Sequence, residues 1–275
     1  MFKIYDLDMK EITLPKGVMP LEIFVGSVAK NRVTEAVDGR VGVVDYGFNY
    51  TDRPVSLFLR IKAADATDFR LLRNEVFATF DVGSAFYVAE ADVPSRVLKV
   101  VVDESYIPDR LTEEYADFDI NCRTLDSVFW ESKYTTLELH DSGYSATVEK
   151  YGLVDNIDDE KVKYRFTENN FTVYNAGNVA IEPENMYISI LFYYCSIPDG
   201  KMTVKNLTTG DVLEVNRTTN RSHIRQDGMV FTIAGVNFFR DTNRKFISLA
   251  PGDNQFEITG ATYDEARFNF KYLYK

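Results

Sequence analysis

Few side chains in this sequence could perform acid–base or metal chemistry, and those few lie far apart. There are two histidines, His140 and His223, and neither has a second His or Cys at the spacing that a metal site needs. His140 ends a predicted strand, and His223 lies in the charged segment RSHIRQ. We expect surface or turn positions for both, because an isolated imidazole without an orienting partner is a poor candidate for a base or a ligand.

Two Asp-x-Asp pairs, Asp6/Asp8 and Asp117/Asp119, are the next candidates. Carboxylates two positions apart on a strand project from the same face and could hold a divalent cation. The residues around the second pair alternate between apolar and polar, which favours solvated carboxylates on the wet face of a strand. The sequence contains no HExxH, P-loop, G-x-S-x-G or dinucleotide-binding motif, and it singles out no carboxylate pair for glycoside hydrolysis.

The two cysteines, Cys122 and Cys195, exclude a disulfide scaffold and a Cys-rich metal site. Cys122 lies on the apolar face of its predicted strand and Cys195 follows the apolar run LFYY, so we expect two buried, inert thiols. The inventory therefore predicts no catalytic residue, no metal and no cofactor. A polysaccharide hydrolase is the least favoured of three functional hypotheses.

The composition is that of an acidic globular chain rich in aromatic residues. Among 275 residues, 45% are hydrophobic and 27% charged, and the formal net charge is −11. This balance excludes a disordered chain, a basic nucleic-acid footprint and attraction to acidic lipid surfaces. No apolar stretch has the length of a signal peptide or a membrane span, so we expect a soluble chain in a reducing cytosol, without membrane association.

The periodicity predicts a mainly β fold with one helix in the first half. Segments 56–62 and 97–103 are short and β-branched, and 116–124 alternates strictly, with one apolar and one polar face. Residues 66–80 have helical spacing, with Asp65 or Thr67 as the N-cap. The apolar face of this helix is expected to contain Phe69, Leu72, Val76, Phe77 and Phe80.

The alternation stops at residues 141–163, which we interpret as a linker between domains 1–140 and 164–275. The second domain shows hairpin signals at 201–215 and 225–233, the latter with Asp227-Gly228 as a type I′ turn. Segments 246–249 and 255–259 are predicted strands on either side of a Pro-Gly-Asp-Asn turn. Short strands at regular spacing indicate a β-sandwich or jelly roll.

Phe and Tyr together number 37, which admits two interpretations. Exposed aromatic rings can stack on sugars, whereas most aromatic side chains fill cores or subunit interfaces, and the second is favoured here. The candidates in the second domain are Tyr187, Phe192, Tyr193, Tyr194, Phe238 and Phe239. A lectin-like protein that recognises a cell-wall glycan through its C-terminal sandwich is therefore the alternative hypothesis.

Several motifs resemble a known family when they are taken in order. Segment 32–61 contains a short strand, an Asp-Gly-Arg-x-Gly turn, a Tyr-Gly pair and a return strand, and it precedes the predicted helix and the aromatic strand SAFYVAEADV. The second half contains FTVYNAGNV with Ile-Glu-Pro, then LTTG, Asp-Gly, LAPGDN and a closing FKYLY. From about residue 20 onward this succession resembles the siphophage distal tail proteins, which are tail-hub components.

The resemblance implies an N-terminal domain that forms a homohexameric ring and a C-terminal galectin-like sandwich outside it. It implies as partners the tail tube protein, a lysin-like tail-tip protein and a receptor-binding or baseplate protein, in the virion tail tip. DNA would pass through the lumen without specific binding. Residues 1–140 carry 16 Lys and Arg against 24 Asp and Glu, a balance of −8, which suits a wall that does not hold phosphates. No enzyme activity is implied. The loops are too short for the inserted carbohydrate-binding module of some relatives.

The turn Asp38-Gly39-Arg40-Val41-Gly42 is the candidate assembly loop. Its two glycines permit positive φ, and the guanidinium of Arg40 can bind a carboxylate through two hydrogen bonds. We expect the turn to shape a loop at the inner or intersubunit surface of the ring, with Arg40 paired to an Asp or Glu of a neighbouring subunit. An ordinary hairpin turn with a solvated Arg is the equally weighted alternative.

Overall fold

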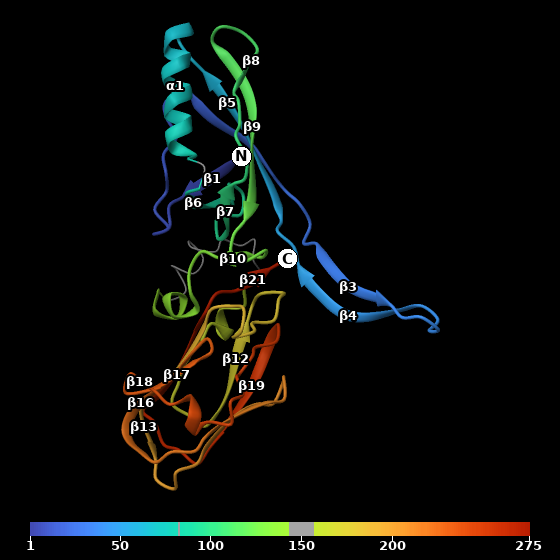
Figure 1. Ribbon diagram of the computed structural model, residues 1–275. Helices are drawn as coiled ribbons and strands as arrows, with labels where there is room; N and C mark the ends of the chain where they lie inside the picture. Colours follow the sequence, from blue (N-terminus) through green and yellow to red (C-terminus); the bar gives the residue numbers. More distant parts are fainter. Residues whose placement is uncertain (82, 143–156) are drawn as a thin grey trace. The chain divides into compact units, whose positions relative to one another are not determined.

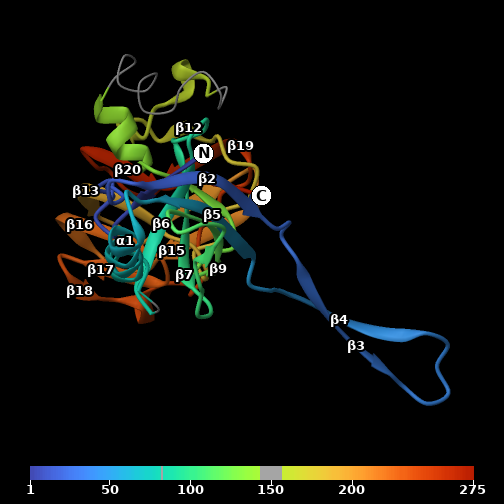
Figure 2. The same cartoon turned by 90° about the horizontal axis from the view of Figure 1, so that it is seen from above.

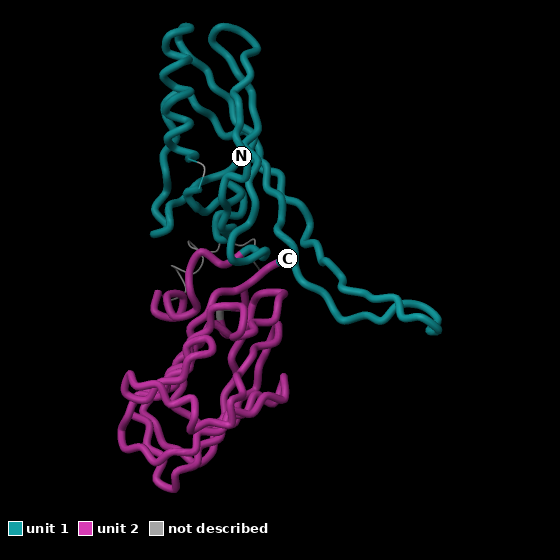
Figure 3. The backbone as a smooth tube through the Cα atoms, viewed as in Figure 1, with its two compact units in different colours: residues 1–130, 275 teal, residues 131–274 magenta. Residues whose placement is uncertain are grey.

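The computed structural model describes residues 1–81, 83–142 and 157–275, which form two compact units, Met1–Trp130 with Lys275 and Glu131–Tyr274 (Figure 3). The division falls before the expected boundary at 140. Residues 131–142 belong to the second unit because their buried side chains bond to the C-terminal chain: Thr136 Oγ1 donates to the carbonyl of Phe268 at 3.0 Å. Of the expected linker 141–163, residues 143–156 lie outside the described residues.

The first unit is built on an antiparallel sheet with the strand order β1-β6-β7-β9-β5-β2, and β8 pairs with β9 (Figure 1). A separate two-stranded sheet, β3–β4, is inserted between β2 and β5. The strands are β1 Phe2–Tyr5, β2 Val18–Val25, β3 Lys30–Ala36, β4 Val43–Tyr50, β5 Pro54–Lys62, β6 Ala85–Glu90, β7 Arg96–Val102, β8 Asp109–Arg110 and β9 Tyr115–Thr124. Strand β10, Trp130–Ser132, follows at the boundary of the units.

Strand β9 confirms the predicted alternation residue by residue. Ala116, Phe118, Ile120, Cys122 and Thr124 are all buried, whereas the residues between them face water wholly or in part. The strand pairs with β5 along its whole length, and the apolar face of β5 adds three fully buried aliphatic side chains, Leu57, Leu59 and Ile61. The core of the first unit therefore lies on one face of these central strands.

Helix α1, Ala66–Thr79, is the predicted helix, and its N-cap is Asp65. One carboxylate oxygen of Asp65 accepts hydrogen bonds from the backbone N–H groups of Thr67 and Asp68, both at 2.8 Å. The expected apolar face is correct except at Phe77, which is 40% exposed. The ring of Phe77 lies against Tyr106 with ring centroids 5.5 Å apart. Phe77 therefore packs on a neighbouring aromatic side chain and not in the core.

The second unit is a sandwich of two antiparallel sheets, with strand orders β11-β20-β13-β16-β17-β18 and β12-β19-β14-β15. A mainly β fold with a C-terminal sandwich is thereby confirmed. Its strands are β11 Arg165–Phe166, β12 Asn170–Asn175, β13 Ile188–Ile197, β14 Met202–Asn206, β15 Asp211–Val215, β16 Thr219–Asp227, β17 Val230–Ile233, β18 Val236–Asn237, β19 Gly252–Thr259 and β20 Glu265–Phe270. The last strand, β21 Leu273–Tyr274, pairs with β10 and not with the sandwich. Two 3-10 turns are η2, Asp159–Lys161, and η3, Phe239–Asp241.

Aromatic rings join the two sheets of the sandwich. Phe166 of β11 stacks on Phe171 of β12 with ring centroids 4.2 Å apart, and Phe256 meets Phe268 edge-on at 4.9 Å. Each pair joins strands of opposite sheets. Part of the large number of aromatic residues in this chain therefore fills the core of the sandwich. No helix among the described residues has the length and apolarity to cross a membrane.

The predicted strand 246–249 is reduced to one antiparallel bridge, between Leu249 and Ile181, and side chains satisfy the backbone of Ser248. The carbonyl of Ser248 accepts from Asn206 Nδ2 at 2.8 Å, and its N–H donates to Asp211 at 2.9 Å. Beside it, the fully buried Asn254 bonds to the N–H and the carbonyl of Ala250, both at 2.8 Å. The Pro-Gly-Asp-Asn turn is therefore held by a satisfied amide network, and the expected strand 255–259 is part of β19.

Two further sequence-based expectations are corrected. The turn between β16 and β17 is centred on Gly228 and Met229, one residue later than predicted, since Asp227 pairs with Val230. Only Gly228 has positive φ, at 55°, which is typical of a type II′ turn with glycine first. His140 ends no strand but lies in helical residues 136–142, where its Nδ1 accepts from the backbone N–H of Tyr164 at 3.4 Å.

We expect Asp65→Ala to destabilise the first unit by about 1 kcal/mol, because two N–H groups of the first turn lose their acceptor. Urea unfolding, monitored by a spectroscopic signal from the first unit, measures the change in the free energy of unfolding. Arg70→Ala, on the exposed side of the same helix, is the control and should change stability by less than about 0.5 kcal/mol. Equal stabilities for the two variants would contradict the capping role.

Candidate assembly surface

The β3–β4 hairpin extends away from the sheet of its own unit (Figure 2). Lys30 pairs with Tyr50 at the base and Ala36 with Val43 near the tip, and a β-bulge interrupts the register after Arg32. All seven residues of β3 are exposed. A two-stranded hairpin with no further strand and no core is marginally stable in water, so this one depends on contacts between its own side chains or with another surface.

Polar and cation–π contacts stabilise the hairpin along its length. Arg32 forms an ion pair with Asp45, and the N–H of Gly47 donates to the same carboxylate at 2.9 Å. The hydrogen bond from Gly47 and the neighbouring guanidinium both lower the pKa of Asp45. The ammonium of Lys30 lies 3.8 Å from the ring centre of Phe48. These contacts define the hairpin but bury little apolar surface.

Seven apolar or aromatic side chains of the hairpin face water. Val41, at the tip, is fully exposed, with a relative exposure of 102%. The others are Val33, Val37, Val43, Tyr46, Phe48 and Tyr50. So many exposed apolar side chains on one element indicate an interaction surface.

The root of the hairpin is fixed by one buried cation, Arg53. Its Nε donates to the carbonyl of Gly26, before β3, and its Nη1 donates to the carbonyl of Val128 at 3.3 Å. Its backbone N–H donates to Thr124 Oγ1 at 2.9 Å. Burial lowers the pKa of the Arg53 guanidinium. Gly26 has no room for a side chain, since a Cβ would lie 2.8 Å from the ring of Pro54.

The predicted assembly turn, Asp38, Gly39, Arg40 and Gly42, forms the tip of this hairpin. The backbone N–H of Arg40 donates to the carbonyl of Val37 at 3.1 Å, and both glycines have positive φ, 81° and 86°. A Cβ at either glycine would meet nothing within 4 Å, so the glycines serve the backbone conformation alone. Within the described part of the chain Arg40 has no ion pair, and its pairing across subunits stays a prediction.

The residues considered for chemistry are engaged in structural contacts. Asp6 accepts from the backbone N–H groups of Asp8 and Lys10 at 3.0 and 2.9 Å, which closes a turn. Asp117 receives two hydrogen bonds from Arg60, at 2.6 and 2.7 Å, and these lower its pKa. No group of three or more potential metal ligands occurs in residues 1–81, 83–142 and 157–275.

Both cysteines are buried and unbridged. Burial raises the pKa of the Cys122 and Cys195 thiols to about 12, so neither is a thiolate at neutral pH. The two residues lie in different units, Cys122 on β9 and Cys195 on β13. Their environments are those of core side chains.

The candidate aromatic residues of the second unit separate into a buried and an exposed group. Phe192 and Phe238 are core residues, and Phe239 stacks with Phe246 at 5.9 Å. Tyr187 is 50% exposed, and its hydroxyl accepts from Asn269 Nδ2 at 3.2 Å. Among these candidates Tyr187 and Tyr194 are therefore exposed, whereas Tyr193 and Phe239 are half-buried.

A β-bulge brings Tyr193 and Tyr194 to the same histidine. The register of β13 and β16 shifts after Phe192, and Tyr194 has φ of 47°, an uncommon value for a residue with a side chain. The two tyrosine rings lie 4.9 and 4.8 Å from the ring of His223. Nδ1 of His223 is buried and has no hydrogen-bond partner within the described residues. His223, which was expected at the surface, is thus half-buried.

Comparison with known proteins places the first unit in a family. Residues 7–122 match the model of the phage tail protein RIFT-related domain. The first unit is therefore similar to a phage tail domain, and it is called the phage tail domain below. This match supports the resemblance to siphophage distal tail proteins. No curated protein sequence matches the chain.

The phage tail domain and the sandwich together share the fold of a solved structure. The Dit protein of phage SPP1, described as a paradigm of the hub adsorption apparatus in phages that infect Gram-positive hosts, matches with a TM-score of 0.66 and 12% identity, over 99% of this chain and 100% of that one. A chain of the phage p2 baseplate in its activated conformation with Sr matches with a TM-score of 0.41 and 11% identity, over 98% and 97%.

Sequence reasoning located the tip of the hairpin in the phage tail domain but missed its root and its exposed apolar side chains. Arg53 follows an Asp in a segment with no motif, and nothing in its neighbours indicates burial. The valines of segment 33–43 all stand at odd positions, as residues on one face of a strand do. Only the missing third strand shows that these side chains face water.

We expect Arg53→Met to lower the free energy of unfolding of the phage tail domain by about 1–3 kcal/mol, since two partly buried carbonyls lose their donor. Hydrogen exchange should also accelerate at the N–H groups of Gly26 and Thr51, which close the root. Thermal unfolding and exchange measured by mass spectrometry report the two effects.

Arg123→Met provides the matched control. Arg123 is half-exposed and pairs with Asp103 at 3.2 Å, so its loss should cost about 0–1 kcal/mol and leave exchange at the root unchanged. The role of Arg53 is refuted if its variant exchanges at the root no faster than this control.

Proposed function

We propose that this protein is a structural subunit of the phage tail hub, which assembles as a homohexameric ring through its phage tail domain. The single observation that carries the proposal is the β3–β4 hairpin, whose apolar side chains face water on an element without a core. In a ring, the hairpin of each subunit covers apolar surface of the next. This heterologous contact closes when the rotation between subunits completes a circle.

The ring joins the tail tube protein to a lysin-like tail-tip protein and offers a dock for a receptor-binding or baseplate protein. The fold shared with the SPP1 Dit protein supports this role. The acidic balance of residues 1–140 suits a lumen through which DNA passes without being held. Synthesis takes place in the host cytoplasm, and the site of action is the virion tail tip. No covalent chemistry is required of any residue.

Native mass spectrometry of the full chain tests the ring, and a hexamer is the expected largest species at high protein concentration. Val41→Asp should reduce the hexamer at least tenfold, because a charge at the hairpin tip cannot be buried without a partner. The melting temperature should stay within about 1 °C, since Val41 has no contact to lose in the subunit. Arg40→Ala should weaken the hexamer without changing the melting temperature.

Leu207→Asp is the matched control, because Leu207 is also an exposed apolar residue but lies in a turn of the second unit. It should leave the hexamer intact. A chain that stays monomeric with the tail tube and tail-tip proteins present, or a hexamer that survives Val41→Asp, would refute assembly through the hairpin.

A lectin-like role for the sandwich is the second candidate, favoured by one observation. Tyr194 is 45% exposed at the bulge, and Arg221 and Asp264, paired at 3.0 Å, lie beside it. An aromatic face with adjacent charged groups can stack on a sugar ring and hydrogen-bond its hydroxyls. Glycan binding would serve host recognition from the same tail hub.

We expect Tyr194→Ala to abolish any binding of the chain to purified cell-wall polysaccharide, measured by co-sedimentation. Phe239→Ala, a change outside this tyrosine and histidine cluster, is the control and should retain it. Failure of the unaltered chain to sediment with the polysaccharide would remove the second candidate and leave the hub proposal unaffected.

A further inference from the structure

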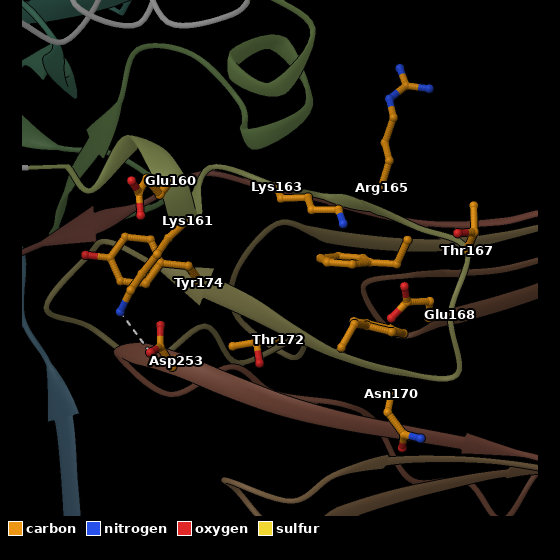
Figure 4. Close-up of a pocket in the computed structure, with 12 residues that line it drawn as sticks. Glu160, Lys161, Lys163, Arg165, Thr167, Glu168, Asn170, Thr172, Tyr174 and Asp253 are labelled. Carbon is orange, nitrogen blue, oxygen red and sulfur yellow. Dashed lines mark hydrogen bonds and ion pairs between the residues drawn. The ribbon is translucent and has the colours of Figure 1, made fainter.

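The open edge of the sandwich contains a groove of about 560 Å³ between β11 and β12 (Figure 4). These two strands are edge strands of opposite sheets: within the described chain β11 pairs only with β20 and β12 only with β19. The stacked rings of Phe166 and Phe171 lie between them, and Phe171 is partly exposed to the groove. An apolar surface thus lies directly beside an unpaired strand edge.

The backbone of β12 has hydrogen-bonding groups that face this groove. The N–H of Ile258 donates to the carbonyl of Asn169 at 2.9 Å, so residues 169, 171 and 173 bond to β19. In an antiparallel pair the alternate residues direct their N–H and C=O to the opposite edge, here Asn170, Thr172 and Tyr174. The Tyr174 carbonyl already accepts from the hydroxyl of Tyr164 at 2.8 Å. Asn170 and Thr172 have no such partner among the described residues.

The cations at the rim of the groove differ in what they already bind. Lys161 pairs with Asp253 at 2.9 Å, and Arg165 pairs with Asp141 at 2.8 Å. Lys163 has no carboxylate partner within the described chain, and its ammonium lies 5.8 Å from the ring centre of Phe166. Its charge is therefore available to a carboxylate of an incoming molecule, next to the aromatic surface.

We infer that the edge of β12 binds an extended peptide segment of another tail protein, which adds to the sheet as a further strand. Backbone hydrogen bonds to Asn170 and Thr172 hold the segment, as in other cases of strand addition to an open sheet edge. One apolar side chain of the segment covers the exposed part of Phe171, which stacks on the buried Phe166, and an adjacent Asp or Glu pairs with Lys163. The inference does not depend on ring formation, because every residue that carries it lies in the second unit.

An extended peptide suits this groove better than a compact ligand. Free N–H and C=O groups that alternate along a strand are matched by another backbone, which offers the same spacing. Natural proteins usually cover or charge such an edge, because it otherwise pairs with any available chain. Here the exposed side chains of β12 near the open groups, Asn170 and Thr172, are uncharged.

The test uses the full chain and a blocked eight-residue peptide of alternating threonine and valine with one phenylalanine–glutamate pair. Fluorescence anisotropy of the labelled peptide should give saturable binding with Kd below about 1 mM. Methylation of the peptide nitrogens, which removes the donors of its backbone, should weaken binding at least tenfold. Hydrogen exchange of the Thr172 amide should be faster than that of Phe171 or Val173, and it should slow when the peptide is added.

Thr172→Pro is the sharpest variant, because proline removes an N–H that faces the groove and leaves the bonds to β19 intact. It should reduce binding at least tenfold with an unchanged melting temperature. Lys163→Glu should reduce binding at least fivefold, and a peptide with lysine in place of glutamate should restore it. This charge exchange decides the question even where Thr172→Pro fails to fold.

The inference is overturned if the peptide does not bind, if it binds Thr172→Pro and Lys163→Glu as tightly as the unaltered chain, or if the Thr172 amide is as protected in the free chain as its neighbours. Pairing of two copies of this chain through β12, seen as a dimer that Thr172→Pro dissolves, would also overturn it. Loss of the hexamer without loss of peptide binding would affect only the proposed function.

Discussion

The phage tail domain depends on a buried guanidinium at the point where the chain leaves the sheet and returns to it. Arg53 links the carbonyl of Gly26, just after the end of β2, to that of Val128, near the end of the unit. A buried cation is costly unless its hydrogen-bond donors are satisfied. The two segments of the chain that meet at Arg53 can therefore adopt few other arrangements. The direction in which the hairpin leaves the sheet is consequently fixed by hydrogen bonds, although the hairpin has no core.

This arrangement explains how an element that is unstable alone can be ready for assembly. The ion pair of Arg32 with Asp45 and the contact of Lys30 with Phe48 hold the two strands together, while the valines stay free. Ordering of a flexible loop on binding would oppose association. Because the root and the strands are ordered beforehand, burial of the apolar side chains can be directed to association between subunits.

Sequence patterns predicted the parts of the fold in which one face is buried and the other wet. The alternation of β9 and the spacing of α1 are of this kind, since each follows from local periodicity. The boundary after Trp130 and the loss of the strand at 246–249 depend on partners far along the chain, such as Thr136 with Phe268 and Asn206 with Ser248. Periodicity gives no indication of such pairs. The exposure of Val41 was not predicted for a related reason: alternation does not show whether a partner strand exists.

The two candidate surfaces of this protein differ in what they leave unsatisfied. The hairpin exposes apolar side chains but pairs its own backbone, so the proposed association through it would be driven by burial, with specificity from shape and from charges such as Arg40. The edge of β12 exposes backbone groups beside an aromatic surface and Lys163, so its association is driven by hydrogen bonds that any extended chain could supply. Selectivity there must come from side chains, and the charge of Lys163 next to Phe166 is the feature that rejects segments without an acidic residue.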